Sequence, residues 1–153
     1  MRLVVAVVGK PRNTALAAVI DDYETRAARY WPLEVHAVRE EKGGGLSPAE
    51  IRDREGARLL ERSGKSRIVA CDAGGKAFTS EEFAGWLQGE REGERDTSIL
   101  VGGAFGLSAQ VLSNASMRLS LATWTLPHEV ARLVLAEQLY RAGSIVRGEP
   151  YHK

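Results

Sequence analysis

The chain has 153 residues, 44% of them hydrophobic and 27% charged, which are the size and composition of one folded domain over residues 1–153. These values exclude wholesale disorder, and no apolar run approaches the roughly 20 residues that a membrane-spanning helix needs. Because 21 Lys and Arg residues face 20 Asp and Glu residues, nucleic-acid binding would require a local basic patch rather than bulk positive charge.

The chain opens with a predicted strand, a helix and a second strand. Residues 3–8 form an unbroken apolar run, which is typical of a strand buried on both faces. From a cap at Asn13 or Thr14, apolar residues recur at spacings of three and four, which predicts a helix that Pro32 ends. Alternation of apolar and polar residues over 33–38 then predicts a half-buried strand.

A glycine-rich loop leads to a helix with a clear start signal. Ser47 and Glu50 can cap each other's backbone amides, Pro48 needs no hydrogen-bond donor at the first helical position, and Gly64 ends the helix. Residues 67–71 then form another short apolar run, which predicts a third strand.

The second half of the chain continues the alternation. Thr79 begins the next predicted helix, and residues 98–101 form the fourth strand. A short helix is expected near residues 108–115, followed by a fifth strand at 119–126. Trp124 falls inside this strand, so we expect its side chain to be buried in the sheet or at a subunit contact.

A last helix opens at residues 127–128, and the whole pattern predicts an α/β fold with a mostly parallel sheet. Ligands in such sheets bind beyond the carboxyl ends of the strands. Three strand ends carry unusual sequence, at 71–75, 102–106 and 125–128. We therefore expect these three loops to form one pocket.

Metal and disulfide chemistry are not predicted. The three histidines, at positions 36, 128 and 152, lack a second ligand at helical spacing. Cys71 is the only cysteine, which favours a reducing, cytoplasmic location and the role of a small buried hydrophobe rather than a nucleophile.

Two motifs each allow a functional and a structural interpretation. The glycine loop at 102–106 matches neither a dinucleotide fingerprint nor a Walker A loop, so it is either a ligand wall or a tight turn. The basic cluster between Arg52 and Arg67 is either an RNA patch or a solvated helix face, and the spacing of Glu50 to Arg54 and of Glu61 to Lys65 favours the solvated face.

The carboxyl-terminal residues are unusual for a tail, since Tyr can stack on a base, His can move a proton and Lys can meet a phosphate. The alternative is a tail that docks through Tyr151 for stability alone.

Four motifs, in their order and spacing, resemble those of a known family. They are SILVGGxxGLS at 98–108, LPH at 126–128, AExLYRA at 136–142 and PYH at 150–152. Over its whole length the chain resembles the bacterial RlmH (YbeA-like) methyltransferases of the SPOUT class.

The resemblance implies transfer of a methyl group from S-adenosylmethionine to N3 of a pseudouridine in a 23S rRNA stem-loop, on assembled ribosomes. It also implies a SPOUT-type trefoil-knotted α/β fold, and a homodimer whose pockets lie near the interface, with no membrane and no metal. The residues alone predict an ordinary open sheet, because chains rarely knot.

The resemblance also implies two sets of site residues, the first of which would hold the cofactor with backbone groups and apolar walls. That set is Cys71, Gly102, Gly103, Gly106, Leu121, Ala122, Thr123, Trp124, Thr125, Leu126, Pro127 and His128. The second set would position the target nucleobase and take up its N3 proton, and it consists of Tyr151, His152, Lys153 and Arg141. Two questions stay open: which tail residue acts as the general base, and which subunit supplies the tail to a given pocket.

The chain departs from the family pattern at two places. Ala104 and Phe105 stand where the family often has Pro-Glu, and Lys153 stands where it often has Arg, which removes a carboxylate and a planar fork respectively. Two alternative functions stay open: a non-catalytic ribosome- or RNA-binding module with the same fold, and an unrelated nucleotide-binding protein, which rests on the glycine loop alone.

Overall fold

The computed structural model describes all residues, 1–153, and contains one five-stranded sheet in the order β2-β1-β4-β3-β5 with every pair parallel. The strands are β1 (Leu3–Val8), β2 (Leu33–Val38), β3 (Arg67–Ala77), β4 (Thr97–Val101) and β5 (Met117–Ser120). The helices are α1 (Thr14–Ala27), α2 (Pro48–Ser63), α3 (Ser80–Glu92), α4 (Ala109–Asn114) and α5 (His128–Val146), with a 3₁₀ turn at Pro150–His152. The predicted α/β class with a parallel sheet is confirmed.

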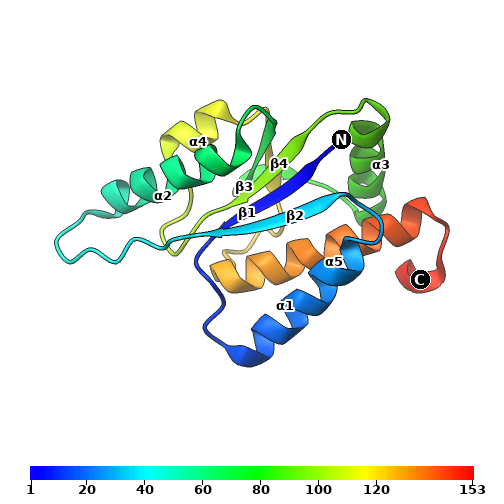
Figure 1. Cartoon of the computed structure of the whole chain (residues 1–153), viewed down its shortest axis with the longest axis horizontal. Coiled ribbons are helices and arrows are strands. Elements are labelled where there is room, and N and C mark those ends of the chain that lie inside the picture. The colour runs from blue at the N-terminus through cyan, green and yellow to red at the C-terminus, as the bar shows by residue number, and fades with distance from the viewer.

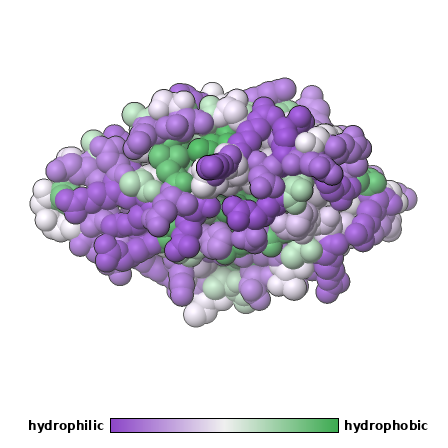
Figure 2. All heavy atoms as spheres, turned by 45° about the horizontal axis from the view of Figure 1, so that its top comes forward, coloured by the Kyte–Doolittle hydropathy of each residue, from purple (hydrophilic) through white to green (hydrophobic).

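Helices cover both faces of the sheet, and the period-two geometry of β1 divides the core between them (Figure 1). Leu3, Val5 and Val7 pack with side chains of α1, α3 and α5, whereas Val4, Ala6 and Val8 pack with side chains of α2 and α4. Burial of one Val or Leu side chain contributes about 1.5–3 kcal/mol, so this strand alone is a major part of the core. The face shown in Figure 2 is mostly hydrophilic, and no helix is long and apolar enough to cross a membrane.

Local capping sets the helix starts where the sequence predicts them. The Ser47 hydroxyl accepts from the Glu50 amide at 3.2 Å, and the Glu50 carboxylate accepts from the Ser47 amide at 2.8 Å. Hydrogen bonding to Ser47 lowers the pKa of Glu50. Thr79 forms the same reciprocal pair with Glu82. Asn13, rather than Thr14, caps α1.

The fifth strand is shorter than predicted, and the prediction that Trp124 lies in a strand is wrong. β5 ends at Ser120, and Trp124 lies in the following loop with 83% of its surface exposed. β5 is an edge strand paired only with β3, and β3 bulges so that Cys71 and Lys76 both face Leu119. β3 ends at Ala77, opposite Ser120, so no partner strand remains to extend β5.

Two other boundaries differ from the predictions. β3 continues through the bulge to Ala77 rather than ending at Cys71, because Gly75 lets the strand approach the Arg118 backbone at a distance that a side chain would block. α1 ends at Ala27, well before Pro32, and a turn then directs Trp31 into the core.

Candidate active site

The three segments that the sequence singles out meet in one pocket of about 500 Å³, beside the bulge of β3 and beyond the carboxyl ends of β4 and β5. A cavity of this size suits a nucleoside-sized ligand. Its lining is mostly hydrophobic and comes from residues 71–73, 105–107, 121–122 and 124–126, together with Arg52 of α2, Ala109 and Leu112 of α4, and Ala131 of α5. The prediction that these loops form a single pocket is confirmed.

The pocket brings together seven of the twelve residues expected around a cofactor. They are Cys71, Gly106, Leu121, Ala122, Trp124, Thr125 and Leu126. Gly102 and His128 lie instead along a small hollow beside the end of β1. Gly103, Thr123 and Pro127 are not among the residues that line the pocket.

The glycine loop is a tight turn and also part of the pocket wall. The Gly106 amide donates to the Gly103 carbonyl at 3.0 Å, and Gly106 has a φ of +81°, which favours glycine. A Cβ atom on Gly102 would lie 2.6 Å from the Gly106 carbonyl carbon. Both interpretations of this loop therefore apply, since the turn presents Gly106 and Leu107 to the pocket.

Cys71 is part of the pocket wall and not a nucleophile. Burial raises the pKa of its thiol to about 12, so the thiol stays protonated near neutral pH. This agrees with its interpretation as a small hydrophobic side chain at a strand end.

Sequence reasoning missed two notable pocket residues. Arg52 of α2 is the one cation that lines the pocket, and Phe105 lies on its rim with 48% of its surface exposed. The only signal for Phe105 was its departure from the family pattern. Arg52 stands out only as part of the basic cluster, and nothing in the sequence indicates that it lines the pocket, since this contact depends on how α2 packs on the sheet.

The predicted helix-face ion pairs are not formed. Glu50 caps its own helix, and Arg54 instead lies 3.6 Å from Glu41 in the loop after β2. Glu61 and Lys65 form no ion pair. The helix face is solvated as expected, with Arg54, Glu61 and Lys65 exposed, but the expected pairing along it is wrong, because Glu41 in the loop after β2 pairs with Arg54 and Arg58.

The tail is docked against α1 and α5. The Tyr151 ring lies edge-on to the Tyr140 ring with centroids 4.5 Å apart, and its hydroxyl donates to Glu137 at 3.1 Å. Burial and these polar neighbours raise the pKa of Tyr151 well above 10. Arg141 donates to the same Glu137 carboxylate, which raises the pKa of the guanidinium. Tyr151 and Arg141, two residues of the second predicted set, therefore meet on Glu137.

His152 has a defined hydrogen-bond arrangement. Its Nδ1 lies 2.9 Å from the Glu149 carbonyl oxygen, which can only accept, so Nδ1 carries the proton in the neutral ring. The lone pair of Nε2 is then available to take a proton from another molecule.

Within one chain the tail and the pocket do not meet. Ala131 near the start of α5 lines the pocket, whereas the tail folds back beyond the other end of this 19-residue helix (Figure 1). The docked tail contacts this helix at Glu137, Tyr140 and Arg141, six to ten residues beyond Ala131, so at about 1.5 Å per residue roughly 9–15 Å of helix lies between tail and pocket.

A buried carboxylate lies beneath the glycine loop. Glu55 of α2 is 3% exposed, and its Oε1 accepts from the Glu41 amide at 3.0 Å, but its Oε2 has no hydrogen-bond partner. A Cβ atom on Gly103 would lie 2.8 Å from that oxygen. Burial raises the pKa of Glu55 above its ordinary value, because the charged form is poorly solvated there.

We expect Glu55→Gln to stabilise the protein at neutral pH. Because folding raises this pKa, the contribution of Glu55 is fully present below the pKa of the unfolded chain and is lost as pH rises through the folded value. Gln mimics the protonated acid, so the variant should melt about 2–4 °C above the parent near pH 8, as about 1 kcal/mol gives at this chain length.

The check is a series of thermal melts from pH 4 to pH 8, in which the difference should shrink at the acid end. Glu61→Gln, at an exposed and unpaired site on the same helix, is the control. Identical pH profiles for Glu55→Gln and the parent would contradict the assignment.

Comparisons with known proteins agree over the whole chain. The family model described as Predicted SPOUT methyltransferase matches residues 1–152. A relative named Ribosomal RNA large subunit methyltransferase H, from Gemmatimonas aurantiaca, is 55% identical over 154 residues and covers 100% of both chains. A relative of the same name from Anaeromyxobacter sp. (strain Fw109-5) is 44% identical over 155 residues, again with 100% of both chains covered. The crystal structure of a tRNA (m1G37) methyltransferase from Aquifex aeolicus is 16% identical, with a TM-score of 0.49 over 90% of this chain and 69% of that one.

Proposed function

The chain belongs to the SPOUT methyltransferase family, and we propose that it methylates large-subunit ribosomal RNA with S-adenosylmethionine. The finer proposal is methylation at N3 of a pseudouridine in a 23S rRNA stem-loop, on assembled ribosomes. The observation that carries it is the pocket of about 500 Å³, because it is built from the same loops that hold the family motifs.

The residues of the pocket fit this cofactor. Leu112, Leu121 and Leu126 provide apolar walls for an adenine ring. Asp72 and Arg52 provide one carboxylate and one guanidinium, which suit the ammonium and carboxylate groups of an amino-acid moiety. When bound, S-adenosylmethionine supplies an electrophilic methyl group on a sulfonium.

We assign the proton-handling role in the tail to His152. A ring nitrogen such as N3 must lose its proton as it gains a methyl group, which calls for a base near neutral pH. His152 has Nε2 available, whereas the hydroxyl of Tyr151 is held by Glu137 and has a raised pKa. Tyr151 then anchors the tail, and Arg141 and Lys153 offer positive charge to phosphate.

We propose that the tail completes the pocket of a second copy in a homodimer. The support is the separation of tail and pocket along α5, together with half-buried Leu133 and Val134 on that helix. The trefoil knot and a cytoplasmic location belong to the same proposal.

Titration calorimetry with S-adenosylmethionine and with ATP tests the cofactor assignment. We expect binding of S-adenosylmethionine and none of ATP, because the glycine loop has no basic residue for phosphates. Preference for ATP would favour an unrelated nucleotide-binding protein. Failure to bind either would favour the non-catalytic RNA-binding module.

A further inference from the structure

A second hollow lies at the same sheet edge as the pocket, at the carboxyl ends of β1 and β2. It has a volume of about 800 Å³ and lies between residues 9–12 and 37–42. We call it the β1–β2 groove. Its cations are Lys10, Arg12, Arg39 and Lys42, and its acids are Glu40 and Glu41.

Both acids of the groove are already neutralised. Glu40 pairs with Arg12 at 2.9 Å. Glu41 lies between two arginines of α2, at 2.5 Å from Arg58 and 3.6 Å from Arg54, and the hydrogen bond from Arg58 lowers its pKa. Both carboxylates are therefore engaged by cations of the protein.

Three cations of the groove remain available. Lys10, Arg39 and Lys42 are exposed and take part in no ion pair. Because the whole chain has a net charge of only +1, such a local excess of positive charge is what anion binding requires.

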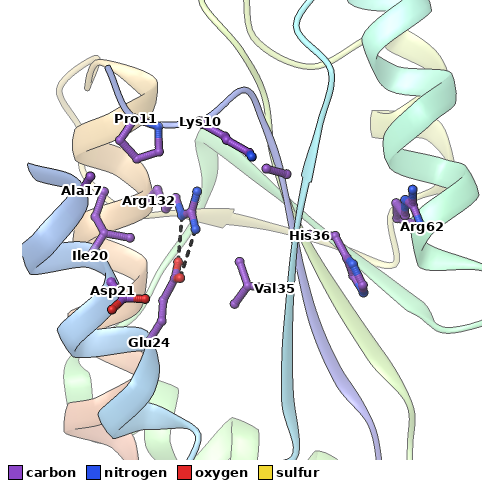
Figure 3. Close-up of a pocket in the computed structure, with 11 residues that line it drawn as sticks. Lys10, Pro11, Ala17, Ile20, Asp21, Glu24, Val35, His36, Arg62 and Arg132 are labelled. Atoms are coloured by element: carbon purple, nitrogen blue, oxygen red, sulfur yellow. Dashed lines mark hydrogen bonds and ion pairs between the residues drawn. The ribbon is translucent and has the colours of Figure 1, made fainter. Parts of the chain in front are cut away.

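A neighbouring groove extends this basic surface along β2. It has a volume of about 580 Å³ and shares Lys10 with the first groove. In Figure 3, Arg62 of α2 and His36 lie on one side of β2, while Arg132 is paired with Glu24 on the other. Arg62, which takes part in no ion pair, extends the positive charge toward α2, whereas the exposed acid Asp21 lies on the other side of β2.

The β1–β2 groove is joined to the pocket side of the edge. The Arg12 amide donates to Glu129 in the first turn of α5 at 2.8 Å. Lys10 also borders the small hollow that contains Gly102 and His128. A polymer whose base enters the pocket can therefore continue across this short stretch onto the groove.

We propose that the β1–β2 groove binds the phosphate backbone of the RNA whose base enters the pocket, through Lys10, Arg39 and Lys42. This rests on the proposed function. Phosphate contacts set the register of a nucleic acid on a protein, while contacts in a pocket select the base. Folded RNA is recognised largely by shape and backbone contacts, which three separated cations along a groove can provide.

The test is a triple variant, Lys10→Ala with Arg39→Ala and Lys42→Ala. Its matched control is Arg2→Ala with Arg29→Ala and Lys65→Ala, which removes three exposed, unpaired cations from the opposite, amino-terminal edge of the sheet. Binding to large ribosomal subunits lacking the modification is measured by sedimentation over a range of KCl concentrations, beside calorimetric S-adenosylmethionine affinity.

We expect the groove variant to bind large subunits at least about tenfold more weakly, and its salt-dependence slope to fall by about 2, since each phosphate contact contributes about 0.7–0.9. Cofactor affinity should be unchanged, and the control should differ from the parent by less than about twofold. Equal behaviour of the two triple variants would overturn the proposal, as would weaker binding with an unchanged salt slope, which indicates a protein contact. A parent that binds subunits through the groove but transfers no methyl group would instead count against the proposed function.

Discussion

Removal of Tyr151, His152 and Lys153 is expected to abolish methyl transfer while changing the affinity for S-adenosylmethionine by less than about twofold. No residue of the tail lines the pocket of its own chain, so the loss of the tail leaves those walls in place. Loss of a general base typically costs about 10²–10⁴ in rate, and the variant also loses its tail cations. The measurements are single-turnover transfer to ribosomes and calorimetric cofactor binding.

Single variants divide this effect. His152→Ala should lower the transfer rate nearly as much as removal of the whole tail. Tyr151→Phe should lower the rate less, because its ring can still pack against Tyr140. A fall in cofactor affinity as large as the fall in rate would count against the tail assignment.

Complementation tests whether the tail acts on the other subunit. Tail-deleted chains co-expressed with Gly102→Ala chains should regain activity, since a mixed dimer contains one intact pocket and one intact tail that face each other. If activity instead matches the sum of the two variants alone, the tail does not act between subunits.

Gly102→Ala alone is expected to weaken binding of S-adenosylmethionine by at least about tenfold, or 1.4 kcal/mol. The added Cβ would lie 2.6 Å from the Gly106 carbonyl carbon and 3.0 Å from the Leu107 nitrogen. These are backbone atoms, so the loop must shift, and it takes the pocket wall with it. Calorimetry measures the affinity, and a thermal melt shows that the variant is folded.

Gly85→Ala is the matched control for this change. Gly85 lies on the exposed side of α3 with open space around its Cα, so the substitution should leave the affinity unchanged and stabilise the helix by up to about 1 kcal/mol. A folded Gly102→Ala protein with parental affinity would show that the glycine loop is no part of the cofactor site.

Features set by neighbouring residues could be predicted from the sequence. The buried strand at Leu3–Val8 and the capping boxes at Ser47 and Thr79 depend on apolar runs and contacts three residues apart, and all three are confirmed. The pocket could also be placed, because parallel strands bring their carboxyl ends to one edge.

Features set by distant residues could not be predicted. The end of β5 and the exposure of Trp124 depend on a bulge in β3, some 45 residues earlier in the chain. Arg54 and Arg58 pair with Glu41 rather than with acids of their own helix, and this pairing depends on where the loop after β2 lies. These two pairs engage Glu41, one of the acids of the β1–β2 groove, which leaves the groove cations Lys10, Arg39 and Lys42 unpaired.

The most direct test of the central claim is transfer of labelled methyl from S-adenosylmethionine to ribosomes that lack the modification, with the label then mapped on the RNA. We predict label at N3 of one pseudouridine in a 23S rRNA stem-loop. An absence of label on both ribosomes and large subunits, with no binding of S-adenosylmethionine, would contradict it.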